Sequence, residues 1–325
     1  MMQTSEAALD KSHSCPLCHF KAGRRMGTVS FRDIWKALEQ DLGARFSSAV
    51  IVRHTPSENT GLYECSDCGL HYFSPAVAGD SEFYRELATT AAAYYSQDKW
   101  DFSMAAGLIP AGSHVLDVAC GSGRFLEILR DKGAVGTGID TNSAAAKEGR
   151  NKGLTVYDEQ LADFAESNGA RFDFVTAFQV IEHVPDAQAF VISAVRCLKP
   201  GGKLVLTVPN RQRCTKYGLE PLDCPPHHVS RWSDRQFQTL ACLARCQLVG
   251  TYLEIARMED CRTSLRRRIA KRHPQSLWAR AVGRVVFGPV LYGAYARLGL
   301  LERWKRWGLS AMCLLEKPAG PMPGP

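Results

Sequence analysis

Strand-like and helix-like segments alternate between residues 113 and about 256, and this pattern most limits the folds open to the chain. Apolar runs such as HVLDV and KLVLTV are typical of buried strands. Residues 143–153 and 187–198 have helical spacing and lie between such runs. Strands that alternate with helices form parallel sheets, because each crossover helix covers a face of the sheet. The sequence therefore predicts an α/β fold with a doubly wound, mainly parallel sheet.

A loop with two glycines, Asp117-Val-Ala-Cys-Gly-Ser-Gly123, joins the first strand to a helix expected to begin near Arg124. Glycine lets the backbone approach a ligand closely, and a helix N-terminus offers unpaired N–H groups. Leu126 stands where the dinucleotide fingerprint Gly-x-Gly-x-x-Gly has its third glycine. Asp140 ends the next strand, where an acid can bind ribose hydroxyls. The pattern favours a nucleoside-containing ligand over a dinucleotide.

Three segments resemble motifs of the class I S-adenosylmethionine-dependent methyltransferases. DVACGSGRFLEIL resembles motif I, GIDTNSAA the second-strand motif, and LKPGGKLVLTVPN the segment that opens the fifth strand. The resemblance implies a Rossmann-like methyltransferase domain over 113–317, with S-adenosylmethionine as the methyl donor. It also implies that the methionine part of the donor lies over motif I and its ribose beside the second strand. The residues expected there are Asp117, Ala119, Gly121, Gly123 and Asp140.

Two further segments extend this resemblance. After the third strand the chain reads YDEQL, and the family pattern places Gln160 and Leu161 beside the adenine. After the fourth strand, FQVIEHVPD resembles small-molecule methyltransferases, including the ubiquinone-type O-methyltransferases, which puts Phe178 and Gln179 on the cofactor side. Glu182 and His183 either contact the acceptor or a divalent ion, or only hold the following helix.

Methyl transfer to a hydroxyl or amine requires removal of a proton, and a histidine of near-neutral pKa suits that role. The segment DCPPHHVSRWS follows the fifth strand, where class I enzymes place contacts to the acceptor. Its Pro-Pro-His-His string resembles one in bacterial methyltransferases that act on sugars and related metabolites. We expect His227 or His228 to be the base; alternatively, the two rings only stabilise the loop.

The N-terminal part contains two Cys-x-x-Cys pairs, Cys15/Cys18 and Cys65/Cys68. Four thiolates at this spacing can surround one Zn²⁺ ion and leave no open position, so a structural zinc site is predicted. The pattern also resembles the N-terminal zinc module of a bacterial methyltransferase group. Between the pairs, an amphipathic segment is expected to be helical; its apolar residues are Phe31, Ile34, Trp35, Leu38, Leu42 and Phe46.

Four parts of the chain are therefore expected. Residues 1–74 form the zinc-binding subdomain, 75–112 a helical connector and 113–317 the methyltransferase domain, with a disordered tail at 318–325. Within the third part, 262–307 is expected to be a basic helical insert. From Arg262 to Arg306 the net charge is +11, whereas the whole chain carries +7. This insert is either a helical lid, a surface for membranes or lipid-linked substrates, or a nucleic-acid contact.

The leading functional expectation is an S-adenosylmethionine-dependent methyltransferase with a small-molecule or glycan acceptor, such as a nucleotide- or lipid-linked sugar. The alternatives are an RNA methyltransferase and a catalytically inactive zinc-bearing binding protein. An RNA enzyme is disfavoured because residues 1–261 are net acidic. Twelve cysteines without a secretory signal favour a reducing compartment. We therefore expect a cytoplasmic location, with peripheral contact to the inner membrane face through the basic insert as an option.

Overall fold

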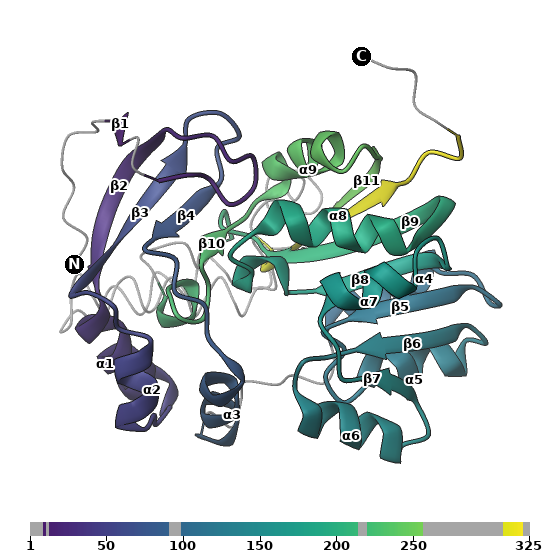
Figure 1. The fold of residues 1–325 in the computed structure, drawn as a ribbon, viewed down its shortest axis with the longest axis horizontal. Coiled ribbons are helices and arrows are strands. Elements are labelled where there is room, and N and C mark those ends of the chain that lie inside the picture. The colour runs from purple at the N-terminus through teal and green to yellow at the C-terminus, as the bar shows by residue number, and fades with distance from the viewer. Residues whose placement is uncertain (1–8, 11–12, 91–98, 214–219, 256–307, 321–325) are drawn as a thin grey trace, which may run out of the picture.

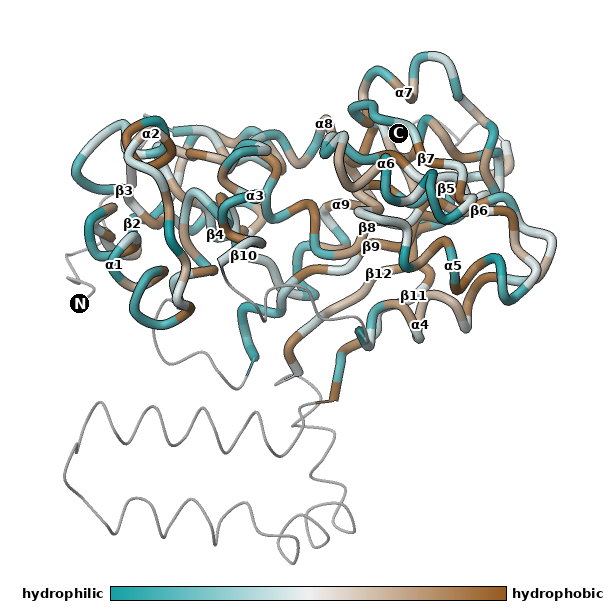
Figure 2. Tube along the Cα trace, turned by 90° about the horizontal axis from the view of Figure 1, so that it is seen from below, coloured by the Kyte–Doolittle hydropathy of each residue, from teal (hydrophilic) through white to brown (hydrophobic). Residues whose placement is uncertain are grey.

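The computed structural model describes residues 9–10, 13–90, 99–213, 220–255 and 308–320. These residues build two sheets that lie side by side along the long axis of the molecule (Figures 1 and 2). The basic insert expected at 262–307 and the tyrosine pair Tyr94-Tyr95 fall outside the described residues.

The larger sheet has seven strands in the order β11-β12-β9-β8-β5-β6-β7. Their bounds are β5 His114–Val118, β6 Val135–Ile139, β7 Thr155–Tyr157, β8 Phe172–Phe178, β9 Leu198–Pro209, β11 Gln247–Leu253 and β12 Ser310–Glu316. The chain adds β6 and β7 on one side of β5 and then β8 and β9 on its other side. The carboxyl end of β5 is therefore the topological switch point, where ligands bind in such sheets. The last strand, β12, pairs antiparallel with both β9 and β11. The predicted α/β fold with a doubly wound, mainly parallel sheet is confirmed.

Helices cover both faces of this sheet. Successive strand residues point to opposite faces, so Val115 packs into one hydrophobic cluster and Leu116 into another. The cluster that contains Val115 is covered by α4 Trp100–Leu108, α5 Arg124–Asp131 and α6 Ser143–Asn151. The opposite face is covered by α7 Leu161–Ser167, α8 Ala187–Cys197 and α9 Phe237–Leu243. Helix α7 is absent from the sequence prediction.

The smaller sheet has the order β1-β2-β3-β4-β10 and is antiparallel. Its strands are β1 Leu9–Asp10, β2 Gly23–Ser30, β3 Asn59–Cys65, β4 His71–Ser74 and β10 Ser230–Arg231. Strand β10 belongs to the loop after β9 and follows the histidine pair His227-His228 closely in the sequence. The N-terminal module is therefore joined by backbone hydrogen bonds to the loop expected to contact the acceptor.

Three helices belong to the N-terminal half. They are α1 Phe31–Leu42, α2 Ser48–Arg53 and α3 Ser81–Thr90. The amphipathic helix predicted from Phe31 onward is confirmed as α1, but it ends at Leu42, so Phe46 lies outside it. The β-branched run Val50-Ile51-Val52 favours a strand, but in the structure it belongs to helix α2. The segment is helical because Ser47 caps it and the Val50 side chain alone is buried.

Candidate active site

The loop after β5 is shaped for close approach of a ligand. Ala119, Gly121 and Gly123 all have positive φ, at 56°, 57° and 83°. At Gly123 a Cβ atom would lie 2.4 Å from a methyl carbon of Leu154, and its φ of 83° would strain any other residue, so glycine is favoured there. The sharp turn directs the start of α5 toward the carboxyl edge of the sheet, as the sequence motif implied.

Asp140 connects this loop to the end of β6. Its carboxylate accepts hydrogen bonds from the backbone N–H of Gly121 at 2.7 Å and of Asn142 at 2.8 Å. Burial is the largest influence on this carboxyl and raises its pKa above the usual range. The acid therefore sits at the rim of the glycine loop, where ribose hydroxyls would replace water.

A pocket of about 470 Å³ opens beside Asp140. Four of the residues expected to bind cofactor line it: Ala119, Asp140, Gln160 and Leu161. Its other walls come from the loop after β8 and from α8, including Val180, Val184 and Phe190. The mostly apolar walls and few polar groups fit a nucleoside.

The remaining expected cofactor residues lie elsewhere around the switch point. The ring of Phe178 packs against Phe102 and Phe125, with centroids 4.9 and 4.7 Å apart. Asp117 is 2% exposed and accepts a hydrogen bond from the Thr176 hydroxyl at 2.7 Å. Burial raises the pKa of this carboxyl to about 7.

Gln179 is the centre of a polar network that sequence reasoning missed. Its side-chain amide donates to Oδ2 of Asp101 at 3.0 Å, and the Thr207 hydroxyl donates to the same oxygen at 3.1 Å. Among the described residues, Oδ1 of Asp101 is buried and has no hydrogen-bond partner. Gln179 has a φ of 57°, a strained value for a residue other than glycine, and such strain often marks functional sites.

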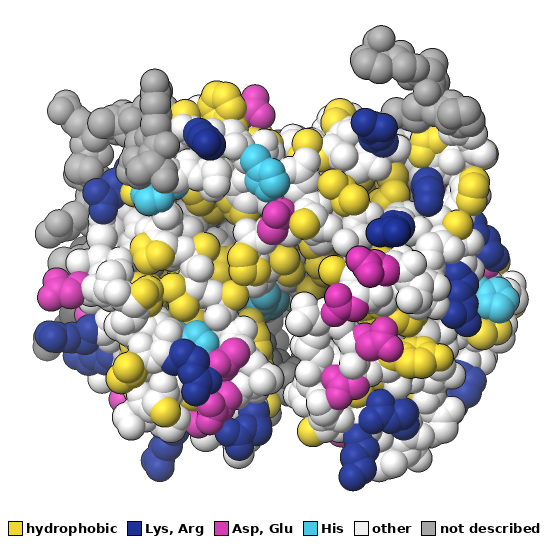
Figure 3. Space-filling model, in the orientation of Figure 1, with side chains coloured by type: hydrophobic (Ala, Val, Ile, Leu, Met, Phe, Trp, Pro, Cys, Tyr) yellow, Lys and Arg dark blue, Asp and Glu magenta, His cyan; other side chains and the backbone are white. Residues whose placement is uncertain are grey.

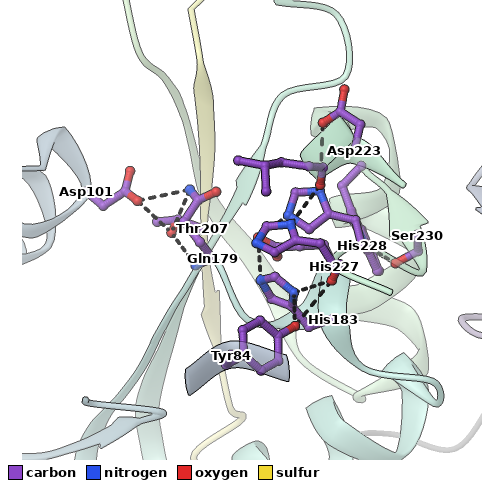
Figure 4. Close-up of polar contacts among 12 residues, drawn as sticks. Tyr84, Asp101, Gln179, His183, Thr207, Asp223, His227, His228 and Ser230 are labelled. Carbon is purple, nitrogen blue, oxygen red and sulfur yellow. Dashed lines mark hydrogen bonds and ion pairs between the residues drawn. The ribbon is translucent and has the colours of Figure 1, made fainter. Parts of the chain in front are cut away.

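A cluster of three histidines lies where the loops after β8 and β9 meet (Figure 4). One ring nitrogen from each of His183, His227 and His228 lies within 4.8 Å of the others. Burial lowers the pKa of all three imidazoles, to about 3 for His183, so the rings are neutral. The structure thus brings the expected base candidates, His227 and His228, together with His183 from the loop after β8.

Glu182 lies against the histidine cluster, and its side chain is only 1% exposed. Its Oε1 lies 3.8 Å from Nε2 of His183 and 4.0 Å from Nε2 of His228. Burial, followed by the charge of Asp101, raises the pKa of Glu182 to about 8. Its backbone carbonyl accepts from Val229 N–H at 2.9 Å, which ties the two histidine-bearing loops together.

The histidine loop is anchored through Asp223 (Figure 4). Arg213 and Arg231 donate to the two carboxylate oxygens at 2.7 and 3.2 Å. Burial alone would raise the pKa of Asp223, but Arg213, His228 and Arg231 together hold it well below its usual range. A stable carboxylate therefore lies 3.8 Å from Nδ1 of His228.

Tyr84, on α3, is a further residue that the sequence did not single out. Its hydroxyl lies 2.8 Å from Nδ1 of His183 and donates to the carbonyl of His227 at 3.3 Å. The N-terminal half therefore contributes a side chain to the histidine cluster. Only the folded arrangement reveals this contact, because 99 residues separate Tyr84 from His183.

The four predicted zinc ligands gather in one cluster. The sulfur of Cys68 lies 3.6 Å from those of Cys15 and Cys18, and Cys18 lies 3.5 Å from Cys65. Tetrahedral Zn²⁺ with Zn–S bonds of about 2.3 Å would separate its sulfurs by roughly 3.8 Å. The cluster therefore fits a tetrahedral ion with only a small adjustment.

The two cysteine pairs have matching backbone turns. His19 N–H donates to the Cys15 carbonyl at 2.9 Å, and Gly69 N–H to the Cys65 carbonyl at 3.0 Å. His19 and Gly69 both have positive φ, 57° and 68°. Each pair thus forms the same tight knuckle, which turns both thiols toward one point.

The knuckles dock on the methyltransferase-like half. Ala187 N–H, at the start of α8, donates to the Pro16 carbonyl at 2.9 Å, and Gln236 donates to the Cys68 carbonyl at 3.0 Å. A second pocket of about 360 Å³ lies at this junction and shares Pro185 and Asp186 with the nucleoside-sized pocket. Figure 3 shows the groove between the two halves, with hydrophobic and histidine side chains inside it.

Comparison with known proteins agrees with this geometry. Residues 91–249 match a family model described as a methyltransferase domain. Residues 91–249 therefore form a methyltransferase domain. The match covers motif I, Asp140 and the Glu182-His183 segment, while the zinc module and the last strand lie outside it.

Two curated relatives of this methyltransferase domain are named ubiquinone biosynthesis O-methyltransferase. The protein from Coxiella burnetii is 36% identical over 105 residues, which are 31% of this chain and 45% of the relative. The protein from Xanthomonas axonopodis pv. citri is 40% identical over 114 residues, or 33% of this chain and 48% of the relative. The chain thus spans less than half the length of these relatives.

Among solved structures, a SAM-dependent methyltransferase from Archaeoglobus fulgidus is similar over 68% of this chain and 95% of its own. The TM-score is 0.48 and the identity 15%. Among the residues that the structure describes, we find no helix with the length and apolar character needed to cross a membrane.

Proposed function

We propose that the chain binds S-adenosylmethionine at the switch point and transfers its methyl group to a small-molecule or glycan acceptor. The nucleoside would occupy the pocket lined by Ala119, Asp140 and Gln160. The methionine end would extend over motif I toward Asp117. The donor would then point its sulfonium toward the histidine cluster, where an acceptor enters from the groove.

The observation that carries this proposal is an excess of buried carboxyl groups. Asp101, Asp117 and Glu182 are each at most 2% exposed. Lys99 influences all three, and it is the only cation among their principal influences in the described part of the chain. A buried carboxyl group stays protonated unless a positive charge compensates its ionised form. The sulfonium and ammonium groups of S-adenosylmethionine supply two.

Removal of the acceptor proton is proposed for the histidine pair. His227 Nδ1 lies 2.7 Å from the Leu222 carbonyl, which can only accept, so this nitrogen donates and Nε2 keeps its lone pair. A neutral imidazole can take the proton at its unprotonated ring nitrogen as the methyl–oxygen or methyl–nitrogen bond forms. The names of the relatives favour a hydroxyl of a small molecule as the acceptor.

A structural zinc ion at the four cysteines is proposed on the sulfur distances and the paired knuckles. Such an ion would hold the module against α8 and β10, and with it the loop of His227. Peripheral membrane contact through 262–307 and a cytoplasmic location stay proposals based on charge and on cysteine usage.

Calorimetry with S-adenosylmethionine, S-adenosylhomocysteine and NAD⁺ tests the donor. We expect the first two to bind and NAD⁺ not to bind; the reverse would overturn the proposal. Transfer of a labelled methyl group to panels of phenols, free sugars, nucleotide sugars and total RNA tests the acceptor class. Label confined to RNA would replace the small-molecule acceptor with the rival enzyme class.

A further inference from the structure

Asp101 is a buried acid of which one oxygen is held and the other is not. The residue lies in the first turn of α4 and is 2% exposed. Its Oδ2 accepts hydrogen bonds from the Gln179 amide at 3.0 Å and from the Thr207 hydroxyl at 3.1 Å. Its Oδ1 is buried and has no hydrogen-bond partner among the described residues. A buried polar atom in this state costs free energy, so a role in binding is the natural explanation for it.

The protein supplies little positive charge to this carboxyl group. Lys99 is the only cation among its principal influences in the described part of the chain. The Lys99 ammonium lies over the Phe102 ring, 5.7 Å from its centroid. Burial is the largest influence on Asp101 and raises its pKa. A ligand that brings a positive charge would therefore stabilise the ionised carboxylate.

The hydrogen bonds of Asp101 place it at the carboxyl ends of β8 and β9. Gln179 directly follows β8, and its backbone N–H donates to the Thr207 hydroxyl of β9 at 3.2 Å. Val180, the next residue after Gln179, lines the nucleoside-sized pocket. Figure 4 shows Asp101, Gln179 and Thr207 as a network separate from the histidine cluster. A cofactor whose nucleoside fills that pocket would therefore bring its sulfur toward the Asp101 network.

We propose that Asp101 determines specificity for the methyl donor over its product, S-adenosylhomocysteine. The inference rests on the proposed function, because methyl transfer is what changes the charge at the sulfur. As the methyl group bonds to the acceptor oxygen or nitrogen, the electron pair of the S–CH₃ bond stays on sulfur and the acceptor proton passes to the proposed histidine base. The positive sulfonium thereby becomes a neutral thioether. Asp101 stabilises the sulfonium and not the thioether, so the donor binds more tightly and the product leaves more readily.

Asp117 is the matched control for this role. It is as buried as Asp101, at 2% exposed, and burial likewise raises its pKa. Its expected partner is the methionine ammonium, which the donor and the product both carry. A substitution at Asp117 should therefore weaken the two ligands to the same extent, whereas one at Asp101 should weaken only the donor.

Calorimetry of the full chain with S-adenosylmethionine and S-adenosylhomocysteine tests the inference. In the unaltered protein we expect the donor to bind about 10- to 100-fold more tightly than the product, the range for one interaction with a charged group. Asp101→Asn keeps the shape of the side chain and removes its charge, so it should abolish this preference by weakening the donor alone. Asp117→Asn should weaken both ligands and keep the preference. A purely structural role of Asp101 would change both affinities together.

An unchanged preference in Asp101→Asn would overturn the inference, as would a preference lost in Asp117→Asn instead. If Asp101→Asn does not fold, sinefungin decides with the unaltered protein, because it carries an amine in place of the methylated sulfur. We expect sinefungin to bind more tightly than S-adenosylhomocysteine, and the opposite order would contradict the role of Asp101. Equal binding of donor and product removes only the inference, whereas no binding of any of the three ligands overturns the proposed function itself.

Discussion

The backbone N–H of Gly121 lies 2.7 Å from Oδ2 of Asp140, so the glycine loop and the acid after β6 are in contact. The bond fixes the carboxylate at the rim of the nucleoside-sized pocket. Its second oxygen is fixed by Asn142 N–H in the same way. The Asp140 carboxylate is therefore already oriented to accept hydrogen bonds from ribose hydroxyls, so binding would cost little conformational entropy.

Asp140→Asn should weaken S-adenosylmethionine binding by about 10- to 100-fold, because a hydrogen bond to a charged group contributes roughly 1.5–3 kcal/mol. Calorimetry measures the change. Asp158→Asn is the control, since Asp158 is exposed and does not line the pocket. Equal affinities in Asp140→Asn and the unaltered protein would remove Asp140 from the cofactor site.

Asp117 should make stability depend on pH. Burial raises its folded pKa to about 7, against an ordinary value of 3.8. The folded carboxyl thus keeps its proton where the unfolded one ionises, so this group lowers stability as pH rises from 3.8 to about 7. Above that pH its contribution is constant.

Asp117→Asn should therefore be more stable than the unaltered protein by roughly 2–4 kcal/mol above pH 7, with the gap closing near pH 4. Thermal melting of both proteins across this range measures it. The variant should also bind S-adenosylmethionine more weakly, since the ammonium loses its partner. A difference in Tm that does not change with pH would contradict the burial argument.

The cysteine site should make stability depend on metal. Hydrogen bonding to Cys65 and burial raise the pKa of the Cys15 thiol to about 12. Zn²⁺ must displace such protons, so binding should release them and weaken in acid. Cys68→Ser, or a strong chelator, should lower the free energy of unfolding by about 3 kcal/mol or more. Cys242→Ser, an exposed cysteine outside the cluster, is the control; equal Tm in the two variants would argue against zinc.

The cofactor loop and the knuckles could be predicted from sequence because local spacing determines them. Positive φ at Gly121 and Gly123 favours glycine, and the spacing of a Cys-x-x-Cys pair is itself typical of a tight turn. The doubly wound, mainly parallel sheet could be predicted because strands alternate with helices that can serve as crossovers.

The residues that were missed come together only through long-range packing. Asp101 meets Gln179 across 78 positions, and Tyr84 meets His227 across 143. Neither Asp101 nor Tyr84 lies in a sequence motif, and an isolated acid or tyrosine on a helix does not by itself indicate a functional site. The helical state of Val50-Ile51-Val52 is hard to predict for a related reason, since a run of β-branched residues does not show which of them will be buried.

Tyr84→Phe removes the hydroxyl through which helix α3 of the N-terminal half contacts His183 of the methyltransferase domain. The phenol lies 2.8 Å from Nδ1 of His183, and its loss leaves the ring held by the His227 carbonyl alone. We expect turnover to fall about 10-fold, as for one lost hydrogen bond of roughly 1.4 kcal/mol, while affinity for S-adenosylmethionine is unchanged. Tyr252→Phe, on the edge strand β11, should leave both unchanged. If Tyr84→Phe instead weakens cofactor binding and spares turnover, α3 supports the cofactor pocket and not the histidine cluster.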